Sequence, residues 1–122
     1  MAGTPEISLM NLMIGQMARF YDVPWRTSST LGGAKTFDAQ AGYESATTLI
    51  AVMMAGANYI WHSAGWNEDE MHCSMAKFIV DAEQCAMAYR MASGIRWDDF
   101  EEGVTGNSEI GTGDTTPDIH IR

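Results

Sequence analysis

The spacing of apolar residues alternates between a helical period and short strand-like runs, and this alternation constrains the fold more than any other feature. Helices are predicted over residues 4–21, 38–56 and 74–93, where apolar side chains recur every three or four positions. Strands are predicted over 24–30 and 59–63, which are short and rich in β-branched or apolar residues. The predicted order is therefore helix, strand, helix, strand, helix.

Each predicted helix carries one apolar face. We expect these faces to be buried, because a helix packs onto its neighbours through its apolar stripe. Asp38 is a favourable N-cap for the second helix. The residues expected to be buried are Ile7, Met10, Ile14, Met17 and Tyr21 in the first helix, Tyr43, Ala46, Ile50, Met53 and Met54 in the second, and Met75, Phe78, Ile79, Ala82, Ala86 and Tyr89 in the third.

Strands that alternate with helices of this length predict an α/β protein with a parallel sheet. The second strand begins as a nearly continuous apolar run, which is typical of a strand covered on both faces. Two strands alone leave the faces and edges of a parallel sheet uncovered. A closed (β/α)8 barrel needs about 250 residues and eight strands, whereas this chain has 122 residues. We therefore predict a part of a larger architecture, or a chain that assembles from copies.

The charge of the chain argues against nucleic acids and membranes as partners. The formal net charge is −9, and the seven Lys and Arg residues are scattered singly, whereas binding to phosphate groups needs clustered positive charge. No apolar run approaches the roughly 20 residues of a membrane-spanning helix, and the first residues lack the features of a signal peptide. A cytoplasmic location is therefore expected.

The two cysteines, Cys73 and Cys85, are predicted to be reduced. If both lie on one helix, their separation of 12 residues places them about 18 Å apart. That distance exceeds the roughly 7 Å between Cα atoms that a disulfide allows. Together with His62 and His72 they lack the spacing of a recognised metal site, so no metal is expected.

The carboxyl ends of the two predicted strands are where an α/β protein places its working site. They carry the hydroxyl-rich segment 26–30 and His62, which lies between Trp61 and Trp66 in the sequence. Aromatic rings near the acidic residues 68–70 can hold an ammonium ion by cation–π attraction. The alternative is that the tryptophans cover helix–strand packing. His62 is interpreted either as an acid, base or orienting group, or as a hydrogen-bonded residue at a strand end.

The most specific signal is a set of four segments that occur in a fixed order. They are MNLMIGQMARFYDVPWRTSS, DAQAGYESA, MAGANYIWHSAGW and KFIVDAE. Together they resemble the C-terminal half of the trimethylamine methyltransferase family, and the resemblance extends from Leu9 to Gly94. Members of this family are corrinoid-dependent enzymes with a TIM-barrel fold. The resemblance therefore implies an α/β chain that forms a partial (β/α)8 barrel.

The resemblance also implies a reaction and a set of site residues. The reaction transfers a methyl group from a tertiary or quaternary amine, of the trimethylamine or betaine type, to the Co(I) of a corrinoid on a partner protein. No cofactor is implied to bind this chain directly. His62 and Glu68 are the implied catalytic residues. The implied substrate-binding residues are Trp25, Asp38, Gln40, Glu44, Trp61, Gly65 and Trp66.

Two features depart from the family pattern. Asp69 and Glu70 stand where members often have glycine, and the end of the chain does not resemble the family's continuation. We expect residues 1–103 to form the C-terminal portion of a barrel domain and residues 104–122 a divergent, flexible tail. Such a chain is not expected to act alone, and the alternative is a non-catalytic barrel fragment that forms a homo-oligomer or docks on a full-length relative. That alternative predicts burial between chains of Ile7, Met10, Ile14, Met53 and Phe78.

Overall fold

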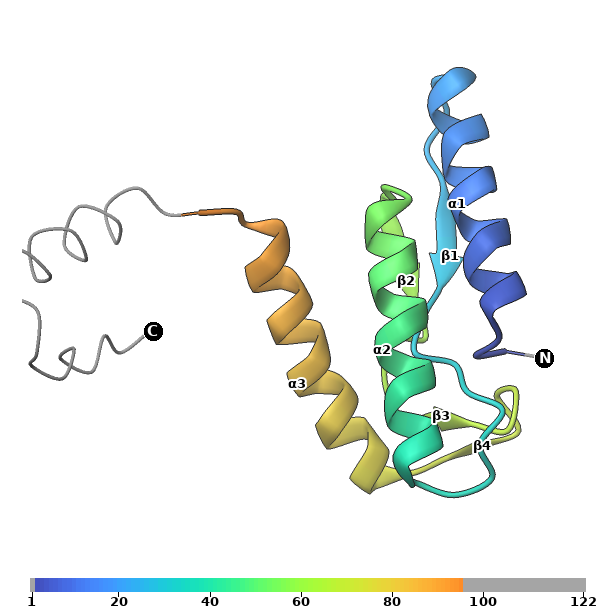
Figure 1. Ribbon diagram of the computed structural model, residues 1–122, viewed down its shortest axis with the longest axis vertical. Coiled ribbons are helices and arrows are strands. Elements are labelled where there is room, and N and C mark those ends of the chain that lie inside the picture. The colour runs from blue at the N-terminus through green and yellow to red at the C-terminus, as the bar shows by residue number, and fades with distance from the viewer. Residues whose placement is uncertain (1, 96–122) are drawn as a thin grey trace, which may run out of the picture. The chain divides into compact units, whose positions relative to one another are not determined.

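Residues 2–95 are described by the computed structural model of the protein, and those up to Ala92 belong to one compact unit. Within this unit the chain alternates between helices and short strands, as the sequence predicts (Figure 1). The strands are shorter than predicted, and an unpredicted hairpin precedes the last helix. The predicted tail over 104–122 lies outside the described residues. In order, the elements are α1 (Pro5–Phe20), β1 (Arg26–Ser28), α2 (Ala39–Met54), β2 (Tyr59–Trp61), β3 (Trp66–Asn67), β4 (His72–Cys73) and α3 (Met75–Ala92).

β1 and β2 form a parallel pair, which confirms the predicted orientation of these two strands. The register runs from Arg26 opposite Tyr59 to Ser28 opposite Trp61. α2 connects the two strands and lies beside them (Figure 1). The arrangement is a βαβ unit, in which a helical crossover is required because parallel strands cannot be joined by a tight turn. Within residues 2–95 this sheet has only these two strands and does not close into a barrel.

Specific contacts fix both ends of α2. The Asp38 carboxylate accepts a hydrogen bond from the Ala41 N–H at 3.0 Å, which confirms Asp38 as the N-cap. At the other end, the Arg19 guanidinium of α1 donates to the Ala55 carbonyl, one of the carbonyls that a helix end leaves without a helical partner. Gly56 follows with a φ of +75°, which glycine adopts without strain, and the chain turns there toward β2.

α1 packs onto the unit through small and polar residues. Its buried residues are Ser8, Asn11 and Gly15. The Asn11 Oδ1 accepts a hydrogen bond from the Thr27 hydroxyl of β1 at 2.8 Å. A Cβ added at Gly15 would lie 2.3 Å from the Ala55 carbonyl oxygen. Glycine is therefore required for the close approach of α1 to the end of α2.

The apolar core of the unit is small and is centred on α2. Val52 is fully buried and Leu49 nearly so, whereas the other buried apolar residues are alanines. Because hydrophobic stabilisation grows with the apolar area removed from water, such a core contributes less than one built of large side chains. Buried hydrogen bonds and one buried ion pair therefore matter for the specificity of this fold.

The apolar faces that the sequence predicted to be buried are largely exposed, so this part of the prediction is wrong. Met54 of α2 is 73% exposed and Phe78 of α3 is 48% exposed. Apart from Leu49 and Val52 of α2, the helices approach the strands and one another mainly through small and polar residues, and within residues 2–95 the predicted apolar faces are left largely uncovered. No helix in this range is long and apolar enough to cross a membrane. The exposed members of the predicted faces include Met10, Ile14, Met17, Tyr21, Tyr43, Ile50, Met54, Met75, Phe78, Ile79 and Tyr89.

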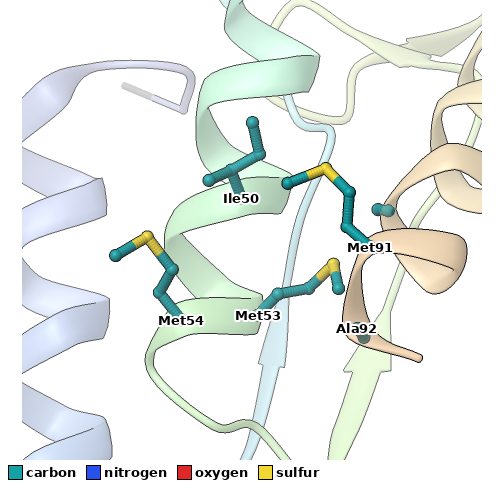
Figure 2. A pocket seen from close by; sticks show the side chains of 6 residues that line it. Ile50, Met53, Met54, Met91 and Ala92 are labelled. Atoms are coloured by element: carbon teal, nitrogen blue, oxygen red, sulfur yellow. The ribbon is translucent and has the colours of Figure 1, made fainter. Parts of the chain in front are cut away.

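An open apolar groove of about 220 Å³ lies between the C-terminal parts of α2 and α3 (Figure 2). α2 begins after the carboxyl end of β1 and ends before the amino end of β2. The groove therefore lies at the end of the unit opposite to the carboxyl ends of the strands (Figure 1). Its lining residues are Ile50, Met53, Met54, Ala88, Met91 and Ala92.

Candidate active site

The loops that follow β1 and β2 meet at the carboxyl ends of the two strands. We call this region the rim, which comprises residues 29–35 after β1 and residues 62–73 after β2. The Thr30 hydroxyl donates to the His62 carbonyl at 3.3 Å and joins the two loops. Thr30 and His62 have φ angles of +54° and +53°. This left-handed conformation costs a residue other than glycine on the order of 1–3 kcal/mol, and such strain clusters at functional sites.

The His62 ring lies between two tryptophans. Its centroid is 5.2 Å from that of Trp61 and 5.5 Å from that of Trp66, with edge-to-face geometry in both pairs. The Trp61 indole N–H donates to His62 Nε2, and His62 Nδ1 lies 3.1 Å from Glu70 Oε1. Both ring nitrogens of His62 therefore have a polar neighbour, the Trp61 N–H at Nε2 and the Glu70 carboxylate at Nδ1. The structure thus brings together three residues that the sequence placed in the site.

This pairing favours one of the roles predicted for His62. An imidazole with both nitrogens engaged is held in a fixed orientation. To accept a proton as a general base, His62 would first have to release the Trp61 N–H. The arrangement therefore suits an orienting group better than a group that transfers protons.

A cation already lies over the ring of Trp61. The Arg26 Cζ is 5.4 Å from the centroid of that ring, which is within the range of cation–π attraction. The aromatic surface at the rim therefore has the chemistry that attracts positive charge. An external cation at this face of Trp61 would compete with Arg26.

The β3–β4 hairpin brings acidic residues to the rim. Trp66 of β3 pairs with Cys73 of β4 in antiparallel register. The turn between the strands contains Glu68, Asp69 and Glu70, whose φ angles are +50°, +54° and +73°. Asp69 and Glu70 thus adopt the left-handed conformation that glycine favours.

Glu68 has two basic neighbours at the rim. Its Oε2 lies 3.6 Å from His72 Nδ1 and its Oε1 lies 4.0 Å from Lys35 Nζ. The Glu68 N–H donates to the Ala34 carbonyl at 3.1 Å, which ties the hairpin to the loop after β1. Because these groups are partly solvated, the ion pairs contribute little stability. Glu68 therefore lies on the same rim as His62, but its carboxylate contacts Lys35 and His72.

Glu44 holds the loop that follows β1. Its buried carboxylate accepts hydrogen bonds from the N–H groups of Gly33 at 2.8 Å and Ala34 at 3.3 Å. The Gln40 amide donates to the other oxygen of Glu44 at 2.8 Å. Glu44 and Gln40 shape the rim through the backbone of this loop, and Asp38 acts as the N-cap of α2.

Trp25 lies apart from the other tryptophans of the predicted site. It precedes β1 at the amino end of the strand, where its N–H donates to Asn58 Oδ1 at 2.9 Å and its carbonyl accepts from the Asn58 N–H at 3.0 Å. Trp61 lies at the carboxyl end of β2, and Trp66 is the first residue of strand β3 in the hairpin. The structure therefore does not bring Trp25 together with the aromatic cluster.

A buried ion pair that was not predicted from the sequence lies beneath the rim. Lys77 and Asp81 of α3 are 0% and 1% exposed. The Lys77 ammonium donates to Asp81 Oδ2 at 2.6 Å, to the Ser45 hydroxyl at 2.7 Å and to the Thr30 carbonyl at 2.8 Å. Asp81 Oδ2 also accepts from the Gly65 N–H at 2.8 Å. The available signal was a Lys and an Asp four residues apart on one helix, a spacing that lets the two side chains pair.

The two cysteines, Cys73 and Cys85, differ in their surroundings. Both are free, and Cys73 is exposed. Burial, together with the nearby Asp81 carboxylate, raises the pKa of the Cys85 thiol, although Lys77 lowers it. A protonated thiol is a poor nucleophile, and Cys85 Sγ donates to the Ser63 carbonyl at 3.4 Å. Among residues 2–95, no group of three or more His, Cys, Asp or Glu side chains is arranged to hold a metal ion.

Fold and site together define an α/β unit whose candidate site lies at the carboxyl ends of parallel strands. Residues 1–115 match the family model described as Trimethylamine methyltransferase (MTTB). The chain therefore belongs to the trimethylamine methyltransferase family, which confirms the family that the sequence motifs indicated.

Several curated relatives are similar to this chain. Glycine betaine methyltransferase of Desulfitobacterium hafniense (strain Y51) is 42% identical over 102 residues, which cover 84% of this chain and 21% of that protein. Trimethylamine methyltransferase MttB of Methanosarcina thermophila is 31% identical over 111 residues, with coverage of 91% and 23%. L-carnitine:corrinoid methyltransferase of Eubacterium limosum is 35% identical over 97 residues, with coverage of 80% and 20%. The chain thus spans about a fifth of the length of these relatives.

Proposed function

We propose that this chain forms one side of the substrate pocket of a corrinoid-dependent amine methyltransferase. The observation that carries the proposal is the Trp61–His62–Trp66 cluster, which lies at the carboxyl ends of parallel strands in a member of this family. In this proposal residues 1–103 belong to a partial (β/α)8 barrel and residues 104–122 form a divergent tail. The relatives named for glycine betaine, trimethylamine and carnitine support a methylated amine as the substrate.

The rings of Trp61 and Trp66 bind the methylated ammonium group in this proposal. Each cation–π contact contributes about 0.5–2 kcal/mol, depending on how far water is excluded. The carboxylates of Glu68 and Glu70 add negative charge at the same rim. The position of Arg26 over Trp61 supports this assignment, because it is an intramolecular example of the same contact.

The remaining predicted residues shape the pocket in different ways. His62 orients the Trp61 indole through Nε2 and is itself held by Glu70. Gly65, with a φ of +86°, sets the direction in which Trp66 enters the pocket. Gln40 and Glu44 act through the loop after β1. The amino-end position of Trp25 leaves it outside this pocket.

The methyl acceptor is the Co(I) of a corrinoid on a partner protein, which is a second substrate. The carbon–nitrogen bond of the amine breaks as the methyl group is transferred, so the task of these residues is to bind and align the ammonium group. A quaternary ammonium substrate releases a neutral amine as its leaving group and needs no proton. A tertiary amine has to carry a proton for its leaving group to be neutral. Because both nitrogens of His62 are engaged, the site suits a quaternary amine.

Binding of glycine betaine to the full chain tests the proposal. The matched ligand control is its isostere 3,3-dimethylbutyrate, which keeps the carboxylate and the shape but has an uncharged tert-butyl group in place of the trimethylammonium group. We expect tryptophan fluorescence to respond to glycine betaine and much less to the isostere. Trp66→Ala should weaken binding by about 2- to 30-fold, whereas Trp25→Ala, at the opposite strand end, should leave it unchanged. Equal responses to the two ligands, or equal effects of the two substitutions, would contradict the proposal.

Turnover provides the second part of the test. Two strands cannot enclose a substrate, so we expect demethylation only when this unit is combined with the other strands of a barrel and with a corrinoid protein. In that assembly, loss of turnover in a folded Trp66→Ala variant supports the pocket. Unchanged turnover removes Trp66 from it.

The exposed apolar faces favour a second candidate function, in which the chain is a non-catalytic fragment that self-associates or docks on a full-length relative. Met10, Ile14 and Phe78 are each more than 40% exposed, and apolar surface of this extent is usually covered by a partner. Sedimentation measurements test this alternative. An oligomer that a polar substitution at Ile14 or Phe78 dissociates would support it, and a monomer with cooperative unfolding would count against it.

A further inference from the structure

In the Lys77–Asp81 pair, the ammonium group of Lys77 has a hydrogen-bond partner for each of its donors. An ammonium group has three N–H donors, and Lys77 directs one to each of Asp81, Ser45 and Thr30. The pair is buried on all sides, since the two side chains are 0% and 1% exposed. Nothing in this geometry leaves a free donor for a ligand, so the pair is not itself a binding site.

The partners of this pair lie on separate segments of the chain. The Thr30 carbonyl belongs to the loop after β1, the Ser45 hydroxyl to α2, and the Gly65 N–H to the loop after β2. Ser45 also donates to the Thr30 carbonyl at 3.3 Å. One ion pair on α3 therefore ties α2 and both loops of the rim together.

The two loop residues that the pair holds are the ones that place the aromatic cluster. Thr30 has a strained φ of +54° and donates to the His62 carbonyl at 3.3 Å. Gly65 immediately precedes Trp66 and has a φ of +86°. A change in either loop would therefore move His62 or Trp66 relative to the other.

Stability alone is a weak reason for a buried ion pair. The free energy needed to remove two charges from water is about as large as the free energy gained from their attraction. Replacement of both partners by apolar residues is therefore often neutral or stabilising. Buried polar pairs are better suited to selecting one arrangement among several, because they penalise every alternative that leaves a charge without its partner.

We infer that Lys77 and Asp81 are positioning residues of the rim, which hold Thr30 and Gly65 so that His62 and Trp66 face one another. The importance of this arrangement for catalysis rests on the proposed function. The positioning itself does not, and it can be measured without substrate.

The test is amide hydrogen exchange by NMR in Lys77→Met/Asp81→Val, which replaces both charges with apolar side chains. Glu83→Leu, which removes an exposed carboxylate from the same helix, is the matched control. We expect the double variant to unfold near the wild-type midpoint while the Gly65 amide exchanges at least about tenfold faster, a change of about 1.4 kcal/mol. The exchange of the Val52 amide reports global unfolding, so Gly65 must lose more protection than Val52.

Equal losses of protection at Gly65 and Val52 in the double variant would overturn the inference, because the pair would then be a general stabilising element. If the double variant does not fold, the wild-type chain still decides the question. The Gly65 amide should be strongly protected there although it lies in a loop, and exchange at the rate of an open loop would overturn the inference. Glycine betaine titration is a separate readout. Failure to bind betaine with a protected Gly65 would reject the proposed function and retain the positioning role.

Discussion

Gly15 and Gly42 are both glycines within helices, and the structure predicts opposite effects for replacing each with alanine. Alanine favours a helix interior over glycine by about 1 kcal/mol. At Gly42 of α2 an added Cβ meets no atom within 4 Å, so Gly42→Ala should stabilise the unit by about that amount. At Gly15 of α1 the added Cβ would lie 2.3 Å from the Ala55 oxygen and 3.0 Å from the Ala55 Cβ.

The clash at Gly15 should outweigh the gain in helix propensity. The Ala55 oxygen is a backbone atom near the end of α2, and it also accepts the hydrogen bond from Arg19. It can move away only by shifting one helix against the other. Overpacking of this kind costs about 1–3 kcal/mol, and a contact with backbone at this distance belongs at the upper end. Subtraction of the propensity gain leaves a net destabilisation of about 2 kcal/mol.

Thermal unfolding measured by circular dichroism provides the assay. For a unit of this size, about 2 kcal/mol corresponds to a decrease in Tm of about 8–16 °C for Gly15→Ala. Gly42→Ala should raise Tm by about 4–8 °C. If both substitutions raise Tm, the close contact between α1 and Ala55 does not exist in solution, and the packing described for α1 is refuted.

Three further predictions concern single groups. Lys77→Met leaves the Asp81 carboxylate buried without its partner and should cost about 3–5 kcal/mol in urea unfolding; a loss below about 1 kcal/mol would mean that water reaches Asp81. Asp38→Ala removes the N-cap of α2 and should cost about 1 kcal/mol by the same assay, whereas no change would show that the cap is dispensable. The raised pKa of Cys85 should shift its alkylation by iodoacetamide to higher pH than that of a free thiol. Because the folded state favours the protonated thiol, the stability that this group contributes should fall as the pH rises above the ordinary thiol pKa. Alkylation with the pH profile of a free thiol would contradict the burial of Cys85.

The order of elements could be predicted because helical periodicity and strand-like runs are local properties of the sequence. The N-cap role of Asp38 was predictable for the same reason. The buried faces were not, because the prediction assumed that apolar stripes meet apolar partners within the chain. Here α1 instead approaches its neighbours through Ser8, Asn11 and Gly15, and its apolar stripe has no cover among the described residues.

The candidate site was predictable where it lies at strand ends and not where it depends on tertiary contacts. His62 follows β2 directly and Trp66 lies four residues further on, so the position of that strand placed both at the rim. The hairpin could not be predicted, because its strands of two residues each are too short to show a period in the sequence. The burial of Lys77 and Asp81 was not predictable in this way, because Lys and Asp side chains are almost never fully buried unless they are paired.

The large sequence separation between Lys77 and its partner Thr30 affects the order in which the unit folds. The hydrogen bond between Lys77 and Thr30 joins residues 47 positions apart, whereas Asp38 caps α2 from three positions away. Contacts between distant residues form late, because closure of a long loop costs entropy before any contact offsets it. The βαβ segment can therefore assemble before α3 docks, with its two loops still free to sample other conformations. We expect the rim to be the last part of the unit to acquire its native geometry and the first to lose it when α3 detaches.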